Sequence, residues 1–311
     1  MSDPTGQALA LWGLQGADCA FVAGRENRVY RVRGPQGDFA LRFKRPGYRS
    51  DAELLSELQW MAALKQAGLN VPGPLPSRRG ALLEVIGDQR VDLLGWMRGQ
   101  PMGHARQPLQ LDEAPSLFHR LGQQMARLHA ASDEWTRPVG FRRCDWNPDG
   151  LLGEAPLWGR FWENPTLDAA TRDLLERFRK TAAQELAQEL AGLDHGLIHA
   201  DLVRENVLID GGDMALIDLD DGGWGFRLFD LATVIFNNRD EAGHDRLQAA
   251  LIAGYRSLRP IDTSLLDLFV ALRAVTYVGW IVPRMAEDGA AARNRRFVDA
   301  ARDCCARYLG G

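Results

Sequence analysis

The segment LIHADLVRENVLIDGGDMALIDLDD, residues 197–221, places several acidic side chains in the most strand-like part of the chain. Its apolar runs at 208–209 and 216–217 flank the tetrapeptide DGGD at 210–213. Two apolar runs joined by a glycine-containing turn are typical of a β-hairpin. Acidic side chains are costly to bury unless they are paired or bind a metal ion. The acids at the ends of this hairpin therefore indicate a site with a chemical role.

Three oxygen-bearing side chains lie at the ends of the predicted hairpin. Asp201 and Asn206 precede its first strand, and Asp218 ends its second strand. Because the ends of an antiparallel hairpin are neighbours, we expect these side chains to lie close together. Carboxylate and amide oxygens suit Mg²⁺, which keeps several waters and also binds phosphate oxygens. An acid held beside the metal could accept a proton from an attacking hydroxyl.

Length and charge bound the class of protein. The chain has 311 residues, of which 46% are apolar, and this predicts a globular protein of two domains or lobes. The formal net charge is −4, and the basic residues are dispersed along the chain. Such a charge does not provide the basic surface that nucleic acids require, so we expect no nucleic-acid partner. Nothing in the composition indicates an oligomeric state.

The cysteines and the N-terminus indicate the compartment. Cys19, Cys144, Cys304 and Cys305 lack the paired spacing of a metal site or a disulfide framework. The first residues, MSDPTGQALALWGLQG, lack the basic start and long apolar run of a signal peptide. No window reaches the roughly 18 apolar residues of a membrane span. We therefore expect a reduced, cytoplasmic protein with no membrane partner.

The first hundred residues predict a small antiparallel sheet with one helix packed on it. Residues 21–44 alternate apolar and polar side chains around the turn GPQGD, which is typical of strands. Ser50 is a suitable cap for a helix over 51–67, where leucines recur at helical spacing. Residues 81–97 read as two further strands joined by a tight turn. We expect residues 1–97 to form an N-terminal lobe.

The remainder of the chain, residues 98–311, is mostly helical and predicts a second, larger lobe. The segment 132–166 within it is irregular and rich in tryptophan. The predicted fold class is α+β, with a small antiparallel-sheet lobe followed by a larger, mainly helical lobe. The helices outside the irregular segment are expected over residues 113–131, 168–192, 240–258, 262–286 and 291–309.

The spacing of the polar residues in the opening segment resembles a known family. The pattern H-x-D-x4-N, followed twelve residues after the asparagine by I-D-x-D, is similar to the aminoglycoside phosphotransferase and choline kinase family of the protein-kinase-like superfamily. The resemblance spans about residues 20–260. It implies a bilobal protein-kinase-like fold and a transfer of phosphate from ATP, with Mg²⁺, to the hydroxyl group of a small molecule.

The resemblance assigns a role to each residue of the predicted hairpin. Asp201 orients and deprotonates the acceptor hydroxyl, and His199 supports the loop that carries Asp201. Asn206 and Asp218 hold Mg²⁺ against the phosphates of ATP.

This chain departs from the family's frequent pattern H-G-D-x-H-x-G-N at Ala200, Val203 and Glu205. Protein kinases of the serine/threonine type usually carry a lysine where this chain has Val203. Arg204 could supply the positive charge for the transferring phosphate instead. Asp220 adds a carboxylate near the predicted metal and is a further candidate metal ligand.

The strand FALRF resembles the one on which kinases carry a basic residue for the α- and β-phosphates, and here that residue is Arg42. Glu57 on the following helix stands where it would pair with Arg42, and Glu53, one turn earlier, ranks second.

Two further segments resemble nucleotide-binding parts of the family. AGRENRVYRV is similar to the loop that covers the phosphates, with Gly24 and Asn27 as candidate contacts. WMRGQ is similar to the hinge that reads adenine, with backbone groups of Trp96, Met97 and Arg98 near the base.

The acceptor is left open among amino alcohols, amino acids, sugars and aminoglycoside-like compounds. The aromatic segment 157–165 could contact a substrate amine through its rings or could form a satellite core, and 222–227 is a second candidate substrate region. One alternative is a bacterial serine/threonine protein kinase; the lack of an evident activation segment after Asp218 favours a metabolite. Another is an inactive nucleotide-binding module, against which the complete set of acids argues.

Overall fold

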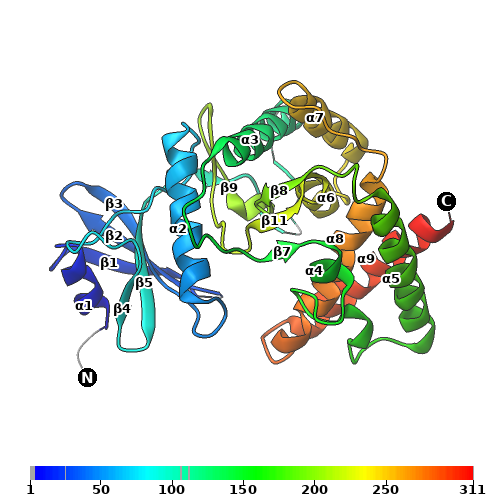
Figure 1. The fold of residues 1–311 in the computed structure, drawn as a ribbon, viewed down its shortest axis with the longest axis horizontal. Coiled ribbons are helices and arrows are strands. Elements are labelled where there is room, and N and C mark those ends of the chain that lie inside the picture. The colour runs from blue at the N-terminus through cyan, green and yellow to red at the C-terminus, as the bar shows by residue number, and fades with distance from the viewer. Residues whose placement is uncertain (1–3, 25, 106, 111–112, 311) are drawn as a thin grey trace. The chain divides into compact units, whose positions relative to one another are not determined.

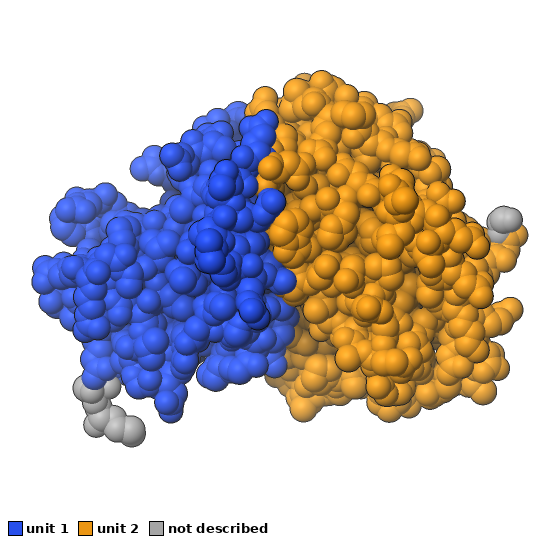
Figure 2. Space-filling model, viewed as in Figure 1, with its two compact units in different colours: residues 1–102, 134–143, 205–220 blue, residues 103–133, 144–204, 221–311 orange. Residues whose placement is uncertain are grey.

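The computed structural model describes residues 4–24, 26–105, 107–110 and 113–310. The sequence predicted a division of the chain after residue 97, whereas unit 1 continues to residue 102 and also takes in two later segments. Figure 2 colours the two compact units, of which unit 1 comprises residues 1–102, 134–143 and 205–220, and unit 2 comprises residues 103–133, 144–204 and 221–311.

Unit 1 contains a five-stranded antiparallel sheet in the order β1-β2-β3-β5-β4 (Figure 1). Val32, Leu41 and Leu93 are buried in one apolar cluster together with Leu9 of the short helix α1 (Pro4–Leu11), which the sequence did not predict. The antiparallel sheet itself was predicted and is confirmed. Its strands are β1 (Asp18–Ala23), β2 (Arg28–Gly34), β3 (Gly37–Phe43), β4 (Glu84–Ile86) and β5 (Gln89–Gly95).

Helix α2 (Asp51–Gln66) begins where Ser50 was expected to cap it. The Ser50 hydroxyl accepts a hydrogen bond from the backbone N–H of Glu53, and the Glu53 carboxylate accepts one from the N–H of Ser50. This reciprocal capping satisfies two backbone donors that the first helical turn leaves without partners. The helix is thereby fixed at its N-terminal end, and its buried acid Glu57 lies in the second turn.

The predicted hairpin is present as β9 (Val207–Asp210) and β10 (Asp213–Leu216), joined by the two-residue turn Gly211–Gly212. Gly211 has a φ of 58°, a left-handed value that hairpin turns require and glycine adopts without strain. On its other side β9 pairs with β6 (Gln100–Pro101), so the hairpin belongs to unit 1.

Unit 2 is mainly helical, as predicted. Helix α6 and a three-stranded sheet in the order β7-β11-β8 were not among the predicted elements. The strands are β7 (Asp145–Trp146), β8 (His195–Ile198) and β11 (Gly223–Phe226). The helices are α3 (Ala114–Glu134), α4 (Pro148–Leu152), α5 (Ala169–Glu189), α6 (Arg227–Asn237), α7 (His244–Arg256), α8 (Leu266–Trp280) and α9 (Ala290–Gly310), with short 3₁₀ turns at Phe161–Glu163, Arg204–Asn206 and Val282–Arg284.

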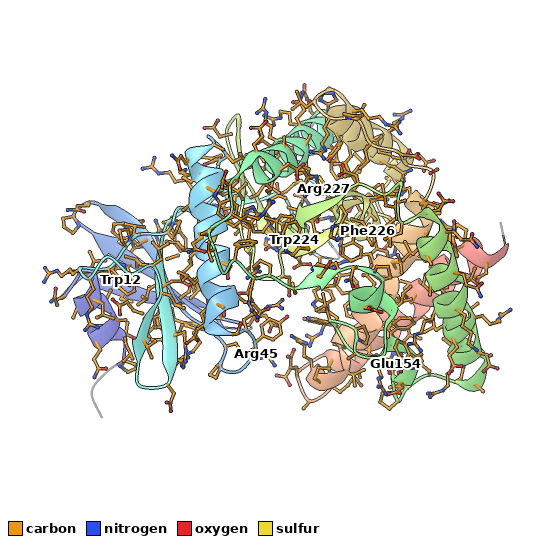
Figure 3. The ribbon with its side chains drawn as sticks, viewed as in Figure 1. Trp12, Arg45, Glu154, Trp224, Phe226 and Arg227 are labelled. Atoms are coloured by element: carbon orange, nitrogen blue, oxygen red, sulfur yellow. The ribbon has the colours of Figure 1, made fainter. Side chains whose placement is uncertain are left out.

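Strand β11 explains the segment 222–227, which the sequence offered as a substrate region. Phe226 and Arg227 are buried, and Trp224 stacks on His195 of the neighbouring strand β8. Figure 3 labels Trp224, Phe226 and Arg227. These side chains are engaged in the packing of the small sheet, an arrangement that supports a structural role for the segment.

Helix α8 lies within the segment Leu266–Arg284, which is long and apolar enough to cross a membrane by length and composition. No segment of this length and apolar composition was expected from the sequence. The share of the window buried inside the protein is 67%, and core helices of water-soluble proteins pass the same test of composition.

Candidate active site

Arg42 lies in a buried cluster of charges on unit 1. Its Nη1 is 2.9 Å from Glu57 Oε1, so the pair predicted from sequence is formed. Its Nε and Nη2 donate to the two carboxylate oxygens of Asp92 at 2.7 and 3.0 Å. Arg42 and Asp92 are directly opposite each other across β3 and β5, which is why their side chains meet. Although burial alone would lower the pKa of Arg42, Asp92 and Glu57 raise it well above its usual value.

Lys44 is a second cation of this cluster, and it was not predicted from the sequence. It is two residues after Arg42 and directly follows the last residue of β3. Like Arg42, it is buried. Its Nζ lies 2.9 Å from Glu57 Oε2 and 3.4 Å from Asp220 Oδ1. Burial by itself would raise the pKa of Glu57, but Arg42 and Lys44 lower it far below its usual range. Glu57 is therefore ionised and shared between two cations.

Arg143 completes the cluster from the segment 134–143. Its Nη2 donates to the backbone carbonyls of Leu219 and Asp220 at 3.0 and 2.7 Å, and its Nη1 donates to the carbonyl of Glu53 at 3.0 Å. This arginine thus ties helix α2 to the residues that follow Asp218. Equal numbers of cations and carboxylates make up the cluster, which consists of Arg42, Lys44, Arg143, Glu57, Asp92 and Asp220.

The hairpin brings Asn206 and Asp218 to the same end of β9 and β10. The backbone N–H of Ile217 donates to the carbonyl of Asn206 at 3.0 Å, and Asp218 is the next residue. Asp218 is exposed, and its φ of 65° is a left-handed value that non-glycine residues rarely adopt. An amide and a carboxylate at one hairpin end are oxygen donors of the kind that Mg²⁺ prefers, so this donor set fits the metal.

Asp220 belongs to the buried charge cluster, whereas Asp218, two residues earlier, is exposed. It is buried, and its carboxylate lies beside the Lys44 ammonium. This placement supports a role in positioning Lys44. Within the described residues, no group of three or more His, Cys, Asp and Glu side chains is arranged to hold a metal ion, and the donor set at the hairpin includes the amide of Asn206.

On unit 2, a buried network holds the loop that carries Asp201. The Asp230 carboxylate accepts hydrogen bonds from the backbone N–H groups of His199 and Ala200 at 2.9 and 2.7 Å. The ring Nδ1 of His199 accepts from the N–H of Asp201 at 3.4 Å. Ala200 has a φ of 65°, so the peptide before Asp201 is held in a strained left-handed conformation.

Asp201 forms an ion pair with Arg273 of helix α8. Arg273 Nη2 lies 2.5 Å from Asp201 Oδ1, and Arg273 Nη1 donates to the carbonyl of Ala200 at 3.1 Å. Arg273 is completely buried, whereas the side chain of Asp201 is 24% exposed. Arg273 was missed in the sequence because helix α8 reads as an apolar core helix there.

A family model described as phosphotransferase enzyme family matches residues 19–262. The chain belongs to the phosphotransferase enzyme family. A homoserine kinase of Gluconobacter oxydans is 31% identical over 250 residues, which cover 77% of this chain and 72% of that protein.

Solved structures of kinases share the fold. A microcompartment-associated aminopropanol kinase is 29% identical with a TM-score of 0.84, and the match covers 98% of this chain and 97% of that one. An amicoumacin kinase in complex with AMP-PNP and Ca²⁺ is 23% identical with a TM-score of 0.74 over 96% of this chain and 91% of that one. The protein is therefore a phosphotransferase of the protein-kinase-like fold, as the resemblance implied.

Within this phosphotransferase, the Arg204 guanidinium is engaged by other groups of unit 2. Its guanidinium donates to Asn238 Oδ1 at 2.8 Å, to the carbonyl of Gln107 at 2.7 Å and to Glu241 Oε1 at 2.6 Å. It is also buried. These contacts tie the loop after Asp201 to unit 2, and they support a structural role in place of the catalytic role predicted from sequence.

The tryptophan-rich segment 132–166 of the phosphotransferase contributes most of its tryptophans to the core. Trp146, Trp158 and Trp162 are buried, and Trp146 packs against Trp158 and the ring of Phe229. The cation over Trp158 is the guanidinium of Arg273, 4.6 Å from the ring centroid. The cation–π contact that the sequence suggested for a substrate amine is thus made by the protein itself.

The remaining predicted nucleotide contacts lie in unit 1. Gly24 is exposed, and Asn27 Oδ1 accepts from the N–H of Arg45 at 3.1 Å, which ties the loop after β1 to the end of β3. The N–H of Trp96 donates to the carbonyl of Asp38 at 3.0 Å, so it is engaged within the sheet. Met97 is half-buried and Arg98 is exposed.

Proposed function

We propose that this phosphotransferase moves the γ-phosphate of ATP to a hydroxyl of a small, amine-bearing molecule, with Mg²⁺ bound. The observation that carries the proposal is the hairpin, which fixes Asn206 and Asp218 at one end and sets Asp220 beside the buried cation Lys44. Asp201 precedes Asn206 by only five residues in the chain. This order of an acid, an amide and a second acid is the order in which protein kinases carry the catalytic-loop Asp and Asn and the later metal-binding Asp.

The nucleotide would be bound by residues of unit 1. Arg42 and Lys44 supply positive charge for the phosphates, and Glu57 keeps both side chains in place. Asn206 and Asp218 would hold Mg²⁺, which shields the phosphate charge when bound. Backbone groups of Met97 and Arg98 are the candidates for contact with the base.

Asp201 acts on the acceptor. Its carboxylate aligns the acceptor hydroxyl and takes the proton as the hydroxyl oxygen forms a bond to the γ-phosphorus. The bond between that phosphorus and the β-phosphate oxygen breaks, and ADP leaves. His199 and Asp230 hold the backbone on which Asp201 stands. Phosphoryl transfer depends mainly on such positioning, because little covalent help is needed.

The relatives support the class of acceptor. Homoserine and aminopropanol, the acceptors in the names of two relatives, each carry a primary amine and a hydroxyl group. We therefore place amino alcohols and hydroxy amino acids first among the acceptors, before sugars without an amine.

A panel of acceptors with Mg-ATP tests the proposal by measuring ADP release. We expect turnover with homoserine or aminopropanol, little with glucose, and none with a generic serine-containing peptide. Asp201→Asn should lower kcat by a factor of about 10² or more, while ATP binding measured by titration calorimetry is retained. Near-wild-type turnover by this variant, or phosphorylation of the peptide alone, would overturn the assignment.

A further inference from the structure

Arg273 combines three contacts in one buried guanidinium. It donates to Asp201 Oδ1, to the carbonyl of Ala200 and, at 2.7 Å, to the hydroxyl of Tyr277. The contacts with Asp201 and Ala200 lie on two consecutive residues of the loop, so the guanidinium fixes both the backbone and the side chain of the acid. Such planar, multi-point hydrogen bonding is specific to arginine and is not reproduced by lysine.

Aromatic rings fix the position of this guanidinium. Its carbon lies 4.3 Å from the ring centroid of Tyr277, 4.6 Å from that of Trp158 and 5.7 Å from that of Phe229. Burying a guanidinium is costly unless it is paired, and the ion pair with Asp201 offsets this cost. A buried cation that is held by three rings has little freedom to follow a moving partner. Arg273 is thus a fixed point to which Asp201 is attached.

The loop that carries Asp201 is held by hydrogen bonds with two residues, Asp230 and Arg273. Asp230 accepts the N–H groups of His199 and Ala200, while Arg273 donates to the carbonyl of Ala200. Because Ala200 is in a left-handed conformation, the loop needs such contacts to stay in this state.

We infer that Arg273 is a positioning residue for the phosphotransfer reaction, which holds Asp201 through its Oδ1 so that Oδ2 faces the acceptor and takes its proton. This inference rests on the proposed function, in which Asp201 is the proton acceptor. Arg273 does not touch the substrate in this assignment. It fixes the orientation of the carboxylate through its contacts with Asp201 Oδ1 and the carbonyl of Ala200.

The pH dependence of the reaction reports this arrangement. Among the described residues, the charged and titratable groups that contact Asp201 and its loop include Arg273 and Tyr277 on α8, His199 beside it, and Asp230 on α6. Removing a cation in direct contact raises the pKa of a carboxylate by about 1–3 units. The acidic limb of kcat/KM should therefore move to higher pH when Arg273 is replaced by a neutral side chain.

The test compares Arg273→Met and Arg273→Lys, with Arg227→Met as a matched control. Arg227 is also a fully buried arginine of unit 2, labelled in Figure 3, and it contacts Asp133 and the carbonyl of Leu197. For Arg273→Met we expect kcat to fall by about 10²-fold, KM for ATP to change less than about 3-fold, and the acidic limb to rise by at least one unit. Arg273→Lys should keep the limb near its wild-type position with an intermediate kcat. Arg227→Met should leave the limb unchanged.

Chemical rescue keeps the inference testable if Arg273→Met folds poorly. In Arg273→Ala, millimolar methylguanidine should restore part of kcat, because it can fill the space between the three rings. An unmoved acidic limb in folded Arg273→Met, or no rescue together with wild-type kcat in Arg273→Lys, would overturn the inference. If Asp201→Asn keeps full activity, the proposed function fails as well; if Asp201→Asn is inactive while Arg273→Met is unaffected, only the role of Arg273 fails.

Discussion

At the scale of single residues, the same type of side chain has different roles one turn apart on helix α2. Glu53 is partly exposed and caps its own helix, whereas Glu57 is buried and shared between Arg42 and Lys44. The resemblance to kinases ranked Glu57 above Glu53 as the partner of Arg42. It could not show Asp92, whose partner is set by the cross-strand register of β3 and β5.

This difference predicts the effect of removing one charge from α2. Glu57→Gln leaves Arg42 and Lys44 buried with one carboxylate fewer, so the free energy of unfolding should fall by about 3–5 kcal/mol. Glu53→Gln is the matched control and should cost less than about 1 kcal/mol, because glutamine can also complete a capping box. Urea unfolding of both variants measures the two losses. Equal losses would contradict the view that the buried charges need Glu57.

At the scale of elements, the hairpin β9–β10 was predicted in full because its signals are local. The apolar residues 207–209 and 214–217 and a two-glycine turn specify both strands and their register. The sheet β7-β11-β8 carries no such signal, since its strands are short and lie far apart in the sequence. The strand β11 was therefore not among the predicted elements.

The turn of the hairpin offers a matched pair of substitutions. Gly211 has a φ of 58° and Gly212 lies outside the left-handed region, and an added Cβ at either meets no heavy atom within 4 Å. Gly211→Ala should therefore lower the free energy of unfolding by about 1 kcal/mol through backbone strain alone. Gly212→Ala should change it by less than half as much. Unfolding in urea compares the two, and a larger loss for Gly212→Ala would exclude the observed turn.

At the scale of the whole molecule, a buried histidine couples stability to pH. The ring of His129 contacts Asp230 at 3.0 Å and the Tyr255 hydroxyl at 2.8 Å. Burial, reinforced by the charge of Arg227, lowers the pKa of His129 from 6.5 to about 4. The unfolded chain therefore binds a proton between pH 6.5 and pH 4 that the folded chain does not bind, so stability falls as the pH falls through this window.

This linkage predicts a loss of about 2 kcal/mol of stability between pH 7 and pH 5 from His129 alone. In His129→Gln the fall in Tm from pH 7 to pH 5 should be smaller than in the wild type. His104→Gln, at an exposed histidine, is the control and should keep the wild-type fall. Thermal unfolding at the two pH values measures the difference; an identical fall in His129→Gln and wild type would refute the linkage.

The sequence predicted the fold and the acids but missed most of the residues that hold them. Strands and helices follow from periodicity, and the motif around Asp201 and Asn206 is local. Arg143 and Arg273 act through contacts 76 and 72 residues away in the chain, and no spacing rule marks them. Lys44 meets Asp220 across 176 residues. A single sequence states which groups are reactive, but which side chains restrain them depends on the packed fold.

Ala200 and Asp218 are two non-glycine residues of the described chain with positive φ. Ala200 directly precedes Asp201, and Asp218 is itself one of the acids assigned to the reaction. Glycine would fit either position with less steric strain, but it would also let the peptide rotate. The left-handed conformation lowers the stability of the fold by about 1–2 kcal/mol at each position. The side chain at each position restricts rotation of the backbone beside the reactive groups. Variants selected only for resistance to heat should tend to lose the backbone strain at these two positions, and we expect their turnover to fall.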